Sequence, residues 1–141
     1  MATIAVVGAG AVGGYYGARL AQAGHDVRFL LRRDLAAVRA NGLRVYSTDG
    51  DFHLKQVSAV ATAQELGEVD WVICSLKATA LEAARDLVAP CVGPTTRIVA
   101  LMNGHWDVAK LLVEAGADVN AWDWWGQTPL FMAVDMNTLP T

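Results

Sequence analysis

The sequence predicts an α/β fold built on a mostly parallel sheet that includes one antiparallel hairpin. A short apolar run at residues 3–7 leads into a glycine-rich turn, a segment with helical spacing at residues 15–23, and a second apolar run at residues 27–31. The same alternation of strand and helix patterns returns over residues 69–102. Strands that alternate with helices in this way form parallel sheets, because each helix carries the chain back to the starting edge.

A short helix and a hairpin are predicted between these two stretches. Asp34 stands directly before an apolar helical pattern and is a favoured N-cap residue, and the helix is expected to stop at the following Asn-Gly pair. Residues 43–48 and 52–57 alternate in hydrophobicity around Asp49 and Gly50, a pair that favours a tight turn. An antiparallel hairpin therefore interrupts the parallel winding.

The second stretch contains a buried strand, a helix and a further strand. The apolar run at residues 69–76 is the strand, residues 79–88 form a helix with Thr79 as its cap, and residues 97–102 form the last strand. Residues 1–103 are therefore interpreted as one Rossmann-type domain, and residues 104–141 as a second segment of different character.

Composition limits the class of protein. The 141 residues are 54% hydrophobic and 18% charged with a net charge of −3, which excludes disordered and fibrous proteins. Nucleic acid is not expected as a partner, because no basic face is interleaved with aromatic side chains. No apolar run approaches the roughly 20 residues that span a membrane, and the first run lacks the basic flank of a signal peptide. We therefore expect a cytoplasmic protein without membrane contact.

The two cysteines show no metal-binding or disulfide pattern. Cys74 and Cys91 are separated in sequence and have no second pair at ligand spacing, so we expect both in the core and predict no metal site.

The glycines at positions 8, 10 and 13 lie between a strand and a helix. In this pattern the first glycine permits a sharp turn, the second lets a pyrophosphate approach the backbone, and the third lets helix and strand pack closely. Gly14 and Gly17 extend this small surface along the helix for packing. The turn is therefore predicted to bind a dinucleotide through Gly8, Ala9, Gly10, Ala11, Val12 and Gly13.

The end of the second strand selects the cofactor. An arginine there would bind the 2′-phosphate of NADP, whereas a carboxylate would bind the ribose 2′-hydroxyl of NAD. Arg32 and Arg33 follow the strand, and the alternative for this pair is a solvated surface position. Asp34 is interpreted as the helix cap rather than as the NAD-type acid, so NADP is the expected cofactor and Arg32 its 2′-phosphate ligand.

Together these segments resemble the N-terminal domain of ketopantoate reductase (2-dehydropantoate 2-reductase) over residues 2–104. The resemblance implies that Lys77 and Asn103 contact the cofactor and that Asn103 also reaches the substrate. Both positions follow the carboxyl ends of strands, where ligands of parallel sheets bind, and the alternatives are a solvated lysine and a turn asparagine. The resemblance is carried by residues 8–13, 24–27, 31–33, 41–43, 70–77 and 97–104.

No catalytic residue is predicted in this chain. The resemblance places the acid-base lysine and the carboxylate that holds the substrate in a helical second domain, which nothing after Gly104 resembles. Lys110 lies on an amphipathic pattern that favours a surface position. The three histidines, His25, His53 and His105, are assigned surface or capping roles.

Residues 104–135 resemble an ankyrin repeat instead. The segment has the pattern of one second helix, a connecting finger and a first helix that Thr128 would cap and Pro129 would begin, although Phe131 stands where the family usually has histidine. One repeat cannot bury its apolar face alone, so the segment would dock on the sheet, begin a truncated array or pair with another chain. Asn103 and Gly104 fit both resemblances, as expected for the junction of a chimera.

Three functions follow from these patterns. The first is an NADP(H)-binding module without its catalytic domain. The second is a protein-interaction module whose ankyrin-like tail binds a protein partner, with Trp122, Trp124 and Trp125 as anchors if they are not in the core. The third is a reductase whose second domain is missing or supplied in trans.

Overall fold

The computed structural model describes residues 1–77 and 80–101 of the chain. By its internal contacts the chain divides into two units, Met1–Met102 and Asn103–Thr141, and the description below concerns the first. Thr79, Asn103 and the ankyrin-like segment with its tryptophans lie outside the described residues. Within the described residues, no helix has the length and hydropathy needed to cross a membrane.

The main sheet has five strands in the order β5-β2-β1-β6-β7, and every neighbouring pair is parallel. Numbered along the chain within this sheet, the order is third, second, first, fourth, fifth, which is the order of a Rossmann fold. The strands are β1 (Thr3–Val7), β2 (Asp26–Leu30), β5 (Ser58–Val60), β6 (Trp71–Cys74) and β7 (Arg97–Ala100).

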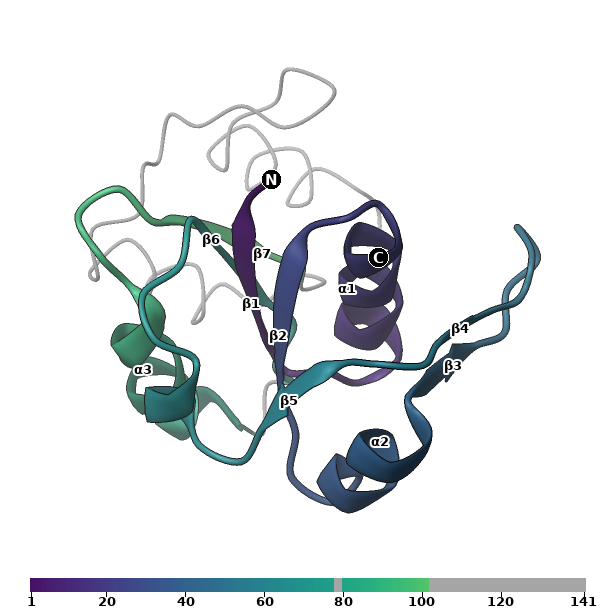
Figure 1. Ribbon diagram of the computed structural model, residues 1–141. Helices are drawn as coiled ribbons and strands as arrows, with labels where there is room; N and C mark the ends of the chain where they lie inside the picture. The colour runs from purple at the N-terminus through teal and green to yellow at the C-terminus, as the bar shows by residue number, and fades with distance from the viewer. Residues whose placement is uncertain (78–79, 102–141) are drawn as a thin grey trace, which may run out of the picture. The chain divides into compact units, whose positions relative to one another are not determined.

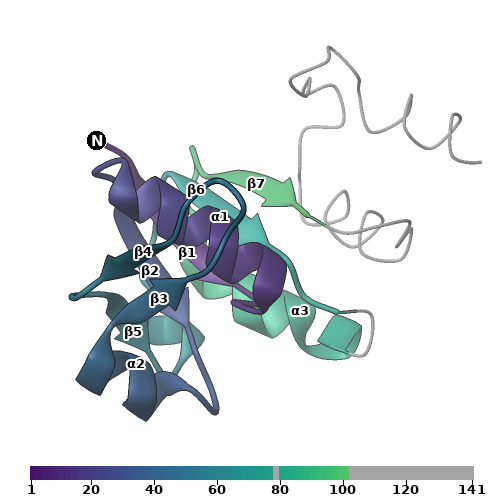
Figure 2. The same ribbon diagram turned by 90° about the vertical axis from the view of Figure 1, so that its right-hand side faces the viewer.

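Helices cover both faces of this sheet, and α1 and α3 lie on opposite sides of it (Figure 1). The side that carries α1 faces the viewer in Figure 2. The α-helices are α1 (Ala11–Gln22), α2 (Leu35–Asn41) and α3 (Leu81–Val88), and two short 3₁₀ helices are η1 (Ala63–Glu65) and η3 (Ala89–Cys91).

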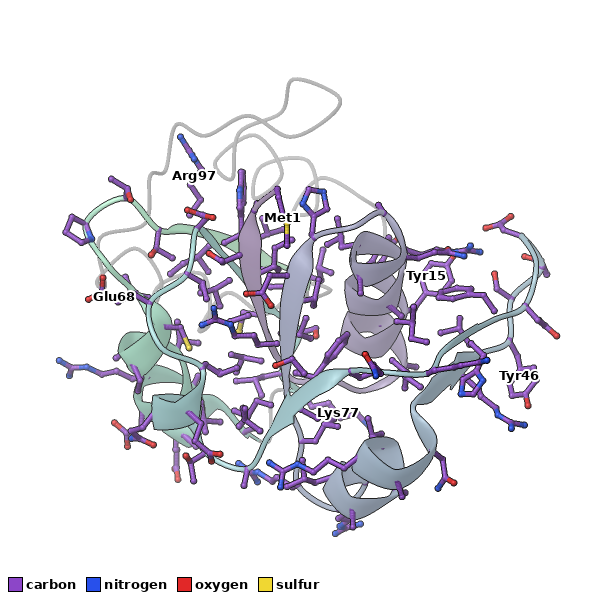
Figure 3. All side chains as sticks on the ribbon, in the orientation of Figure 1. Met1, Tyr15, Tyr46, Glu68, Lys77 and Arg97 are labelled. Carbon is purple, nitrogen blue, oxygen red and sulfur yellow. The ribbon has the colours of Figure 1, made fainter. Side chains whose placement is uncertain are left out.

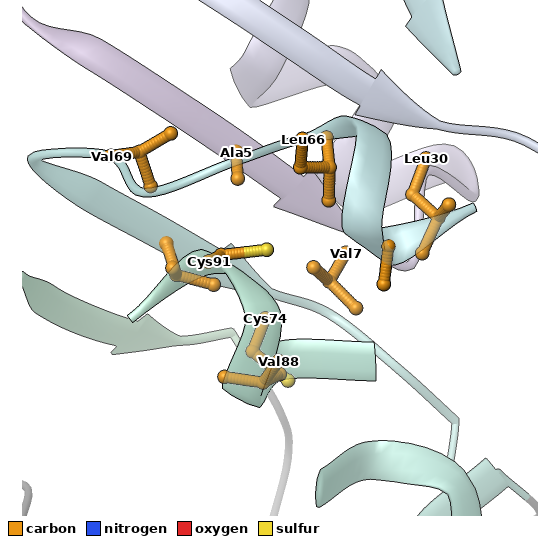
Figure 4. Packing of buried hydrophobic residues seen from close by; sticks show 10 residues of the cluster. Ala5, Val7, Leu30, Leu66, Val69, Cys74, Val88 and Cys91 are labelled. Carbon is orange, nitrogen blue, oxygen red and sulfur yellow. The ribbon is translucent and has the colours of Figure 1, made fainter. Parts of the chain in front are cut away.

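The strand period divides the core into two clusters. Side chains alternate between the faces of a strand, so Ile4 and Val6 of β1 pack in one cluster and Ala5 and Val7 in the other. The second cluster, shown in Figure 4, includes Val88 of α3 and both cysteines. Both Cys74 and Cys91 are fully buried, which confirms the prediction that they are core residues.

Helix α1 begins earlier than the sequence predicts, at Ala11 instead of residue 15. Its first turn includes Gly13 and Gly14, which have low helix propensity, so the local pattern did not indicate a helix there. Packing overrides that propensity, because Gly13 and Gly17 are buried against their neighbours. A Cβ on Gly17 would lie 2.7 Å from side-chain atoms of both Phe29 and Val6.

The hairpin is present, but its strands are shorter than predicted. Strands β3 (Leu43–Val45) and β4 (Phe52–Leu54) pair antiparallel, and residues 46–51 form a loop in place of a tight turn at Asp49 and Gly50. Inside the loop the Ser47 N–H donates to Asp51 Oδ1 at 2.9 Å, and the Gly50 N–H donates to the Ser47 carbonyl at 3.0 Å. These local bonds replace the ladder bonds that a longer hairpin would have.

Arg19 of α1 attaches this hairpin to the domain. Its guanidinium lies 4.6 Å from the centre of the Phe52 ring and donates to the Gly50 carbonyl. Tyr15, labelled in Figure 3, donates from its hydroxyl to Asp49 Oδ2 at 3.1 Å. The hairpin is therefore held against the exposed side of α1.

Strand β5 was not predicted. The sequence pattern extended a hairpin strand to residue 57, whereas the structure ends that strand at Leu54 and pairs Ser58–Val60 with β2. Arg39 of α2 supports the new strand by donating from Nε and Nη2 to the Ala59 carbonyl at 3.1 and 3.0 Å.

Candidate nucleotide-binding site

The candidate site lies at the carboxyl edge of the parallel sheet. The chain leaves β1 toward the face that carries α1 and leaves the neighbouring β6 toward the face that carries α3. Ligands of open α/β sheets bind at this kind of switch between faces. In Figure 3, Lys77 lies toward this edge, whereas Met1 and Arg97 lie toward the opposite end. The residues that follow β1 and β6 are therefore the first candidates.

Two of the three glycines, Gly8 and Gly13, pack closely against residues of the domain interior. Gly8 has a φ of +94°, and a Cβ there would lie 2.6 Å from the backbone carbonyl carbon of Ser75. A Cβ on Gly13 would lie 2.1 Å from Ser75 Oγ and 2.6 Å from the Gly8 carbonyl oxygen. Larger residues at either position would push the turn away from β6.

Gly10 lies on the outer, solvent-exposed side of the turn. It is exposed, and a Cβ built there would have no other atom within 4 Å. Its φ of −78° is open to any residue, so backbone conformation does not require glycine here. The missing side chain leaves space outside the turn, where a ligand can approach the backbone.

The N-terminus of α1 opens at the same place and is not neutralised. Gly10 is the N-cap residue and supplies no side-chain cap, and the first turn contains no acidic residue. Within the described residues, the N–H groups of Ala11, Val12 and Gly13 have no hydrogen-bond partner. Three free donors at the positive end of a helix dipole fit the phosphates of a dinucleotide.

Basic side chains follow the neighbouring strands. Arg32 and Arg33 come directly after β2, Lys77 follows β6, and all three are exposed. In the described part of the chain, none of them has a side-chain hydrogen bond or ion pair. These cations are available to an anionic ligand at the carboxyl edge.

The predicted capping role of Asp34 is wrong in one respect. Asp34 is the N-cap residue of α2 by position, and its carbonyl accepts the Val38 N–H at 2.9 Å, but its side chain makes no cap hydrogen bond. Its ψ of 1° differs from the extended conformation in which a carboxylate reaches back to the first-turn N–H groups. The exposed carboxylate therefore remains available beside Arg32 and Arg33 in sequence.

The predicted cofactor residues that the structure describes all follow carboxyl ends of sheet strands. Ser75 was not among them, although its hydroxyl contacts the turn at Gly8 and Gly13. A hydroxyl residue directly after a buried strand was the available signal. The predicted residues at this edge are Gly8, Ala9, Gly10, Ala11, Val12, Gly13, Arg32 and Lys77.

The histidines and cysteines of the described part have other roles. His25 Nδ1 accepts the Ala2 N–H at 3.2 Å, and His53 Nε2 lies 2.8 Å from the Asn41 carbonyl. Burial raises the pKa of both thiols, that of Cys91 to about 11. Both cysteines therefore stay protonated and unreactive at neutral pH.

A separate groove of about 450 Å³ lies on the α1 face of the sheet. Its apolar lining includes Leu20 of α1, Trp71 and Ile73 of β6, and Val99 of β7. None of the residues of the glycine-rich turn lines it, and the ionisable side chains of its lining are Tyr16, Arg19 and His25. The groove is therefore distinct from the candidate site.

Strand order, the glycine-rich turn and the uncapped helix N-terminus together define a Rossmann-type dinucleotide-binding domain. The family model of ketopantoate reductase PanE/ApbA matches residues 4–128, and the chain belongs to this family. The match extends past residue 104, into the segment for which we predicted an ankyrin-like repeat, and that repeat stays a prediction.

Similar sequences and solved structures support membership of this family. A 2-dehydropantoate 2-reductase of Nostoc sp. is 43% identical over 111 residues, which cover 77% of this chain and 35% of the relative. The crystal structure of a 2-dehydropantoate 2-reductase from Geobacter metallireducens GS-15 matches with a TM-score of 0.79 and 42% identity, over 83% of this chain and 38% of that one. The chain thus spans about a third of the length of the relatives it matches.

The cofactor expected from the sequence fits this family. Arg32 and Arg33 predict NADP, which is consistent with membership of the ketopantoate reductase family. A ternary structure of D-mandelate dehydrogenase with NADH matches with a TM-score of 0.67 and 25% identity, over 84% of this chain and 38% of that one. This neighbour of similar fold therefore binds NADH.

Proposed function

We propose that this chain is an NADP(H)-binding domain of the ketopantoate reductase type. Gly10 carries the proposal, because the turn is filled on its inner side at Gly8 and Gly13 but open on its outer side at Gly10. A turn with a purely structural role would not need a glycine at a position with ordinary φ and open space. A ligand that approaches the backbone explains the residue.

Residues of this chain would bind two different groups of the nucleotide. The free N–H groups of Ala11, Val12 and Gly13 would bind the pyrophosphate, and Arg32 would bind the 2′-phosphate with a charge-assisted hydrogen bond. Lys77 would add a second cation at the same edge. When bound, NADPH supplies a hydride, and the domain supplies its position and charge environment.

The test is a titration of the whole chain with NADPH and with NADH, in which binding is measured from the fluorescence of the nucleotide. We expect NADPH to bind more tightly, because a charge-assisted bond contributes about 1.5 to 3 kcal/mol, or about 10- to 150-fold in affinity. Arg32→Glu should remove this preference, whereas Arg44→Glu makes the same charge change on the exposed side of β3 and should preserve it. Gly10→Glu should abolish binding of both nucleotides without loss of the fold, because its side chain meets only open space.

Equal affinity for NADPH and NADH in the parent protein would contradict the arginine assignment. Asp34, whose carboxylate makes no cap bond, would then be the ribose-binding acid, and Asp34→Asn would weaken NADH binding. Failure of both nucleotides to bind the folded protein would overturn the proposed function itself.

We further propose that the 141 residues bind the cofactor without reducing 2-dehydropantoate. Reduction of a ketone needs a positioned proton donor as well as the hydride, and the basic residues described at the carboxyl edge are assigned to the cofactor. Asn103, outside the described residues, is the proposed substrate contact. When the chain is mixed with NADPH and excess 2-dehydropantoate, the absorbance of NADPH should show no steady decrease. A steady decrease that the Gly10→Glu variant abolishes would refute the proposal that the 141 residues do not reduce 2-dehydropantoate.

A further inference from the structure

Ser75 joins the two ends of the glycine-rich turn. It follows the last residue of β6, and its N–H continues the sheet by donating to the Val7 carbonyl at 2.9 Å. Its hydroxyl donates to the Gly8 carbonyl at 2.7 Å, across 67 residues of sequence. The same oxygen occupies the space that a Cβ on Gly13 would need.

The Gly8 carbonyl is held from two sides. It accepts the Ser75 hydroxyl and also the Gly10 N–H, both at 2.7 Å, so both of its lone pairs are in use. Two bonds fix the plane of the peptide that begins the turn, and the contact with Gly13 fixes where α1 begins. The directions of the N–H groups between these points follow from both constraints.

We propose that Ser75 is a positioning residue for nucleotide binding, which sets the glycine-rich turn in its binding conformation before the nucleotide arrives. The hydroxyl donates its proton to Gly8 inside the domain, so its effect on the nucleotide passes through the turn. Preorganisation of this kind lowers the ordering cost of binding. This inference rests on the proposed function and adds the residue that prepares the site.

The test compares NADPH affinity in Ser75→Ala and in the parent chain. We expect a loss of about two- to tenfold, the range that one hydrogen bond contributes, and recovery in Ser75→Thr, which keeps the hydroxyl. Thr96→Val is the control for loss of stability, because the Thr96 hydroxyl also donates to a backbone carbonyl, that of Val69, and accepts the Gly93 N–H at 2.9 Å, but at the amino edge of the sheet. It should lower the melting temperature at least as much as Ser75→Ala and leave NADPH affinity unchanged.

A second ligand separates positioning from general destabilisation. Adenosine 2′-monophosphate carries the phosphate assigned to Arg32 but no pyrophosphate, so its own dissociation constant, obtained from competition with NADPH after correction for the NADPH affinity of each variant, should change little in Ser75→Ala. Equal weakening of both ligands, or NADPH affinity equal to that of the parent, overturns the positioning role. If Ser75→Ala does not fold, Ser75→Cys keeps the volume with a weak donor and should show the same selective loss.

The two proposals fail separately. A folded parent chain that does not bind NADPH contradicts the proposed function. A parent that binds NADPH, with an unaffected Ser75→Ala, contradicts only the role of Ser75.

Discussion

Replacing Gly17 with alanine should destabilise the domain even though alanine is the better helix former. The added Cβ would lie 2.7 Å from Phe29 Cε1 and 2.7 Å from Val6 Cγ2, well inside van der Waals contact. Both neighbours are buried, with exposures of 1% and 0%, so neither side chain can move into solvent. Overpacking of this kind costs about 1 to 3 kcal/mol, and the gain in helix propensity returns about 1 kcal/mol. The expected net loss is about 1 kcal/mol.

Gly14→Ala is the matched control in the same helix. Its Cβ would meet the Ala9 carbonyl oxygen at 3.7 Å, an ordinary contact, and no other atom closer. The helix-propensity gain of about 1 kcal/mol should therefore appear without an opposing cost. The two variants make the same chemical change and differ only in what the methyl group meets.

Thermal unfolding followed by circular dichroism measures both effects. For a chain of this size 1 kcal/mol shifts the melting temperature by about 3 to 5 °C, so the two variants should differ by about 6 to 10 °C, with Gly17→Ala below the parent. A Gly17→Ala melting temperature as high as that of Gly14→Ala would refute the argument that close helix–sheet packing requires a glycine at position 17.

Three further changes test the core, the thiols and the amino edge of the sheet. Leu66→Ala should cost about 2 to 5 kcal/mol in urea unfolding, because Leu66 is fully buried in the cluster shown in Figure 4, and a change under 1 kcal/mol would contradict that packing. Cys74 and Cys91 should not react with a thiol reagent at pH 8 until urea unfolds the chain, because both are buried with raised pKa values. Hydrogen bonds from the Thr3 N–H and hydroxyl lower the pKa of Asp70, so its stabilising contribution is complete above the unfolded value near 3.8 and is lost as pH falls through the folded value. The difference in unfolding free energy between the parent and Asp70→Asn should therefore shrink below about pH 4, and a difference that grows there would contradict this assignment.

The sequence predicted the central strands and the turn because their signals are local. Strands β1 and β6 are apolar runs buried on both faces, which is the usual pattern of central parallel strands, and β2 buries Val27, Phe29 and Leu30 around the half-buried Arg28. The glycine-rich turn requires a left-handed φ at Gly8 and a close approach at Gly13, and both requirements select a residue without a side chain.

The errors arose where tertiary contacts decide the structure. Strand β5 has three residues, too few for a periodic pattern, and its place depends on β2 and Arg39. The contact of Ser75 with the turn joins residues 67 apart, and the local signal, a hydroxyl residue directly after a buried strand, does not identify its partner. Asp34 has the residue type and position of a cap, but the backbone angle that enters α2 keeps its carboxylate away.

The pairing of β1 with β6 also has a consequence for synthesis of the chain. β1 forms its ladder with β2 early, since Ile4 pairs with Val27, but its other edge waits for β6, where Ile4 pairs with Trp71. Translation adds about 5 to 20 residues per second, so the 67 residues between the partners take about 3 to 13 s to synthesise. During that interval the most buried strand of the mature domain has an open, apolar edge. An open apolar edge of this kind is a template for pairing with another chain, so the time between synthesis of β1 and of β6 is when the chain is most exposed to aggregation.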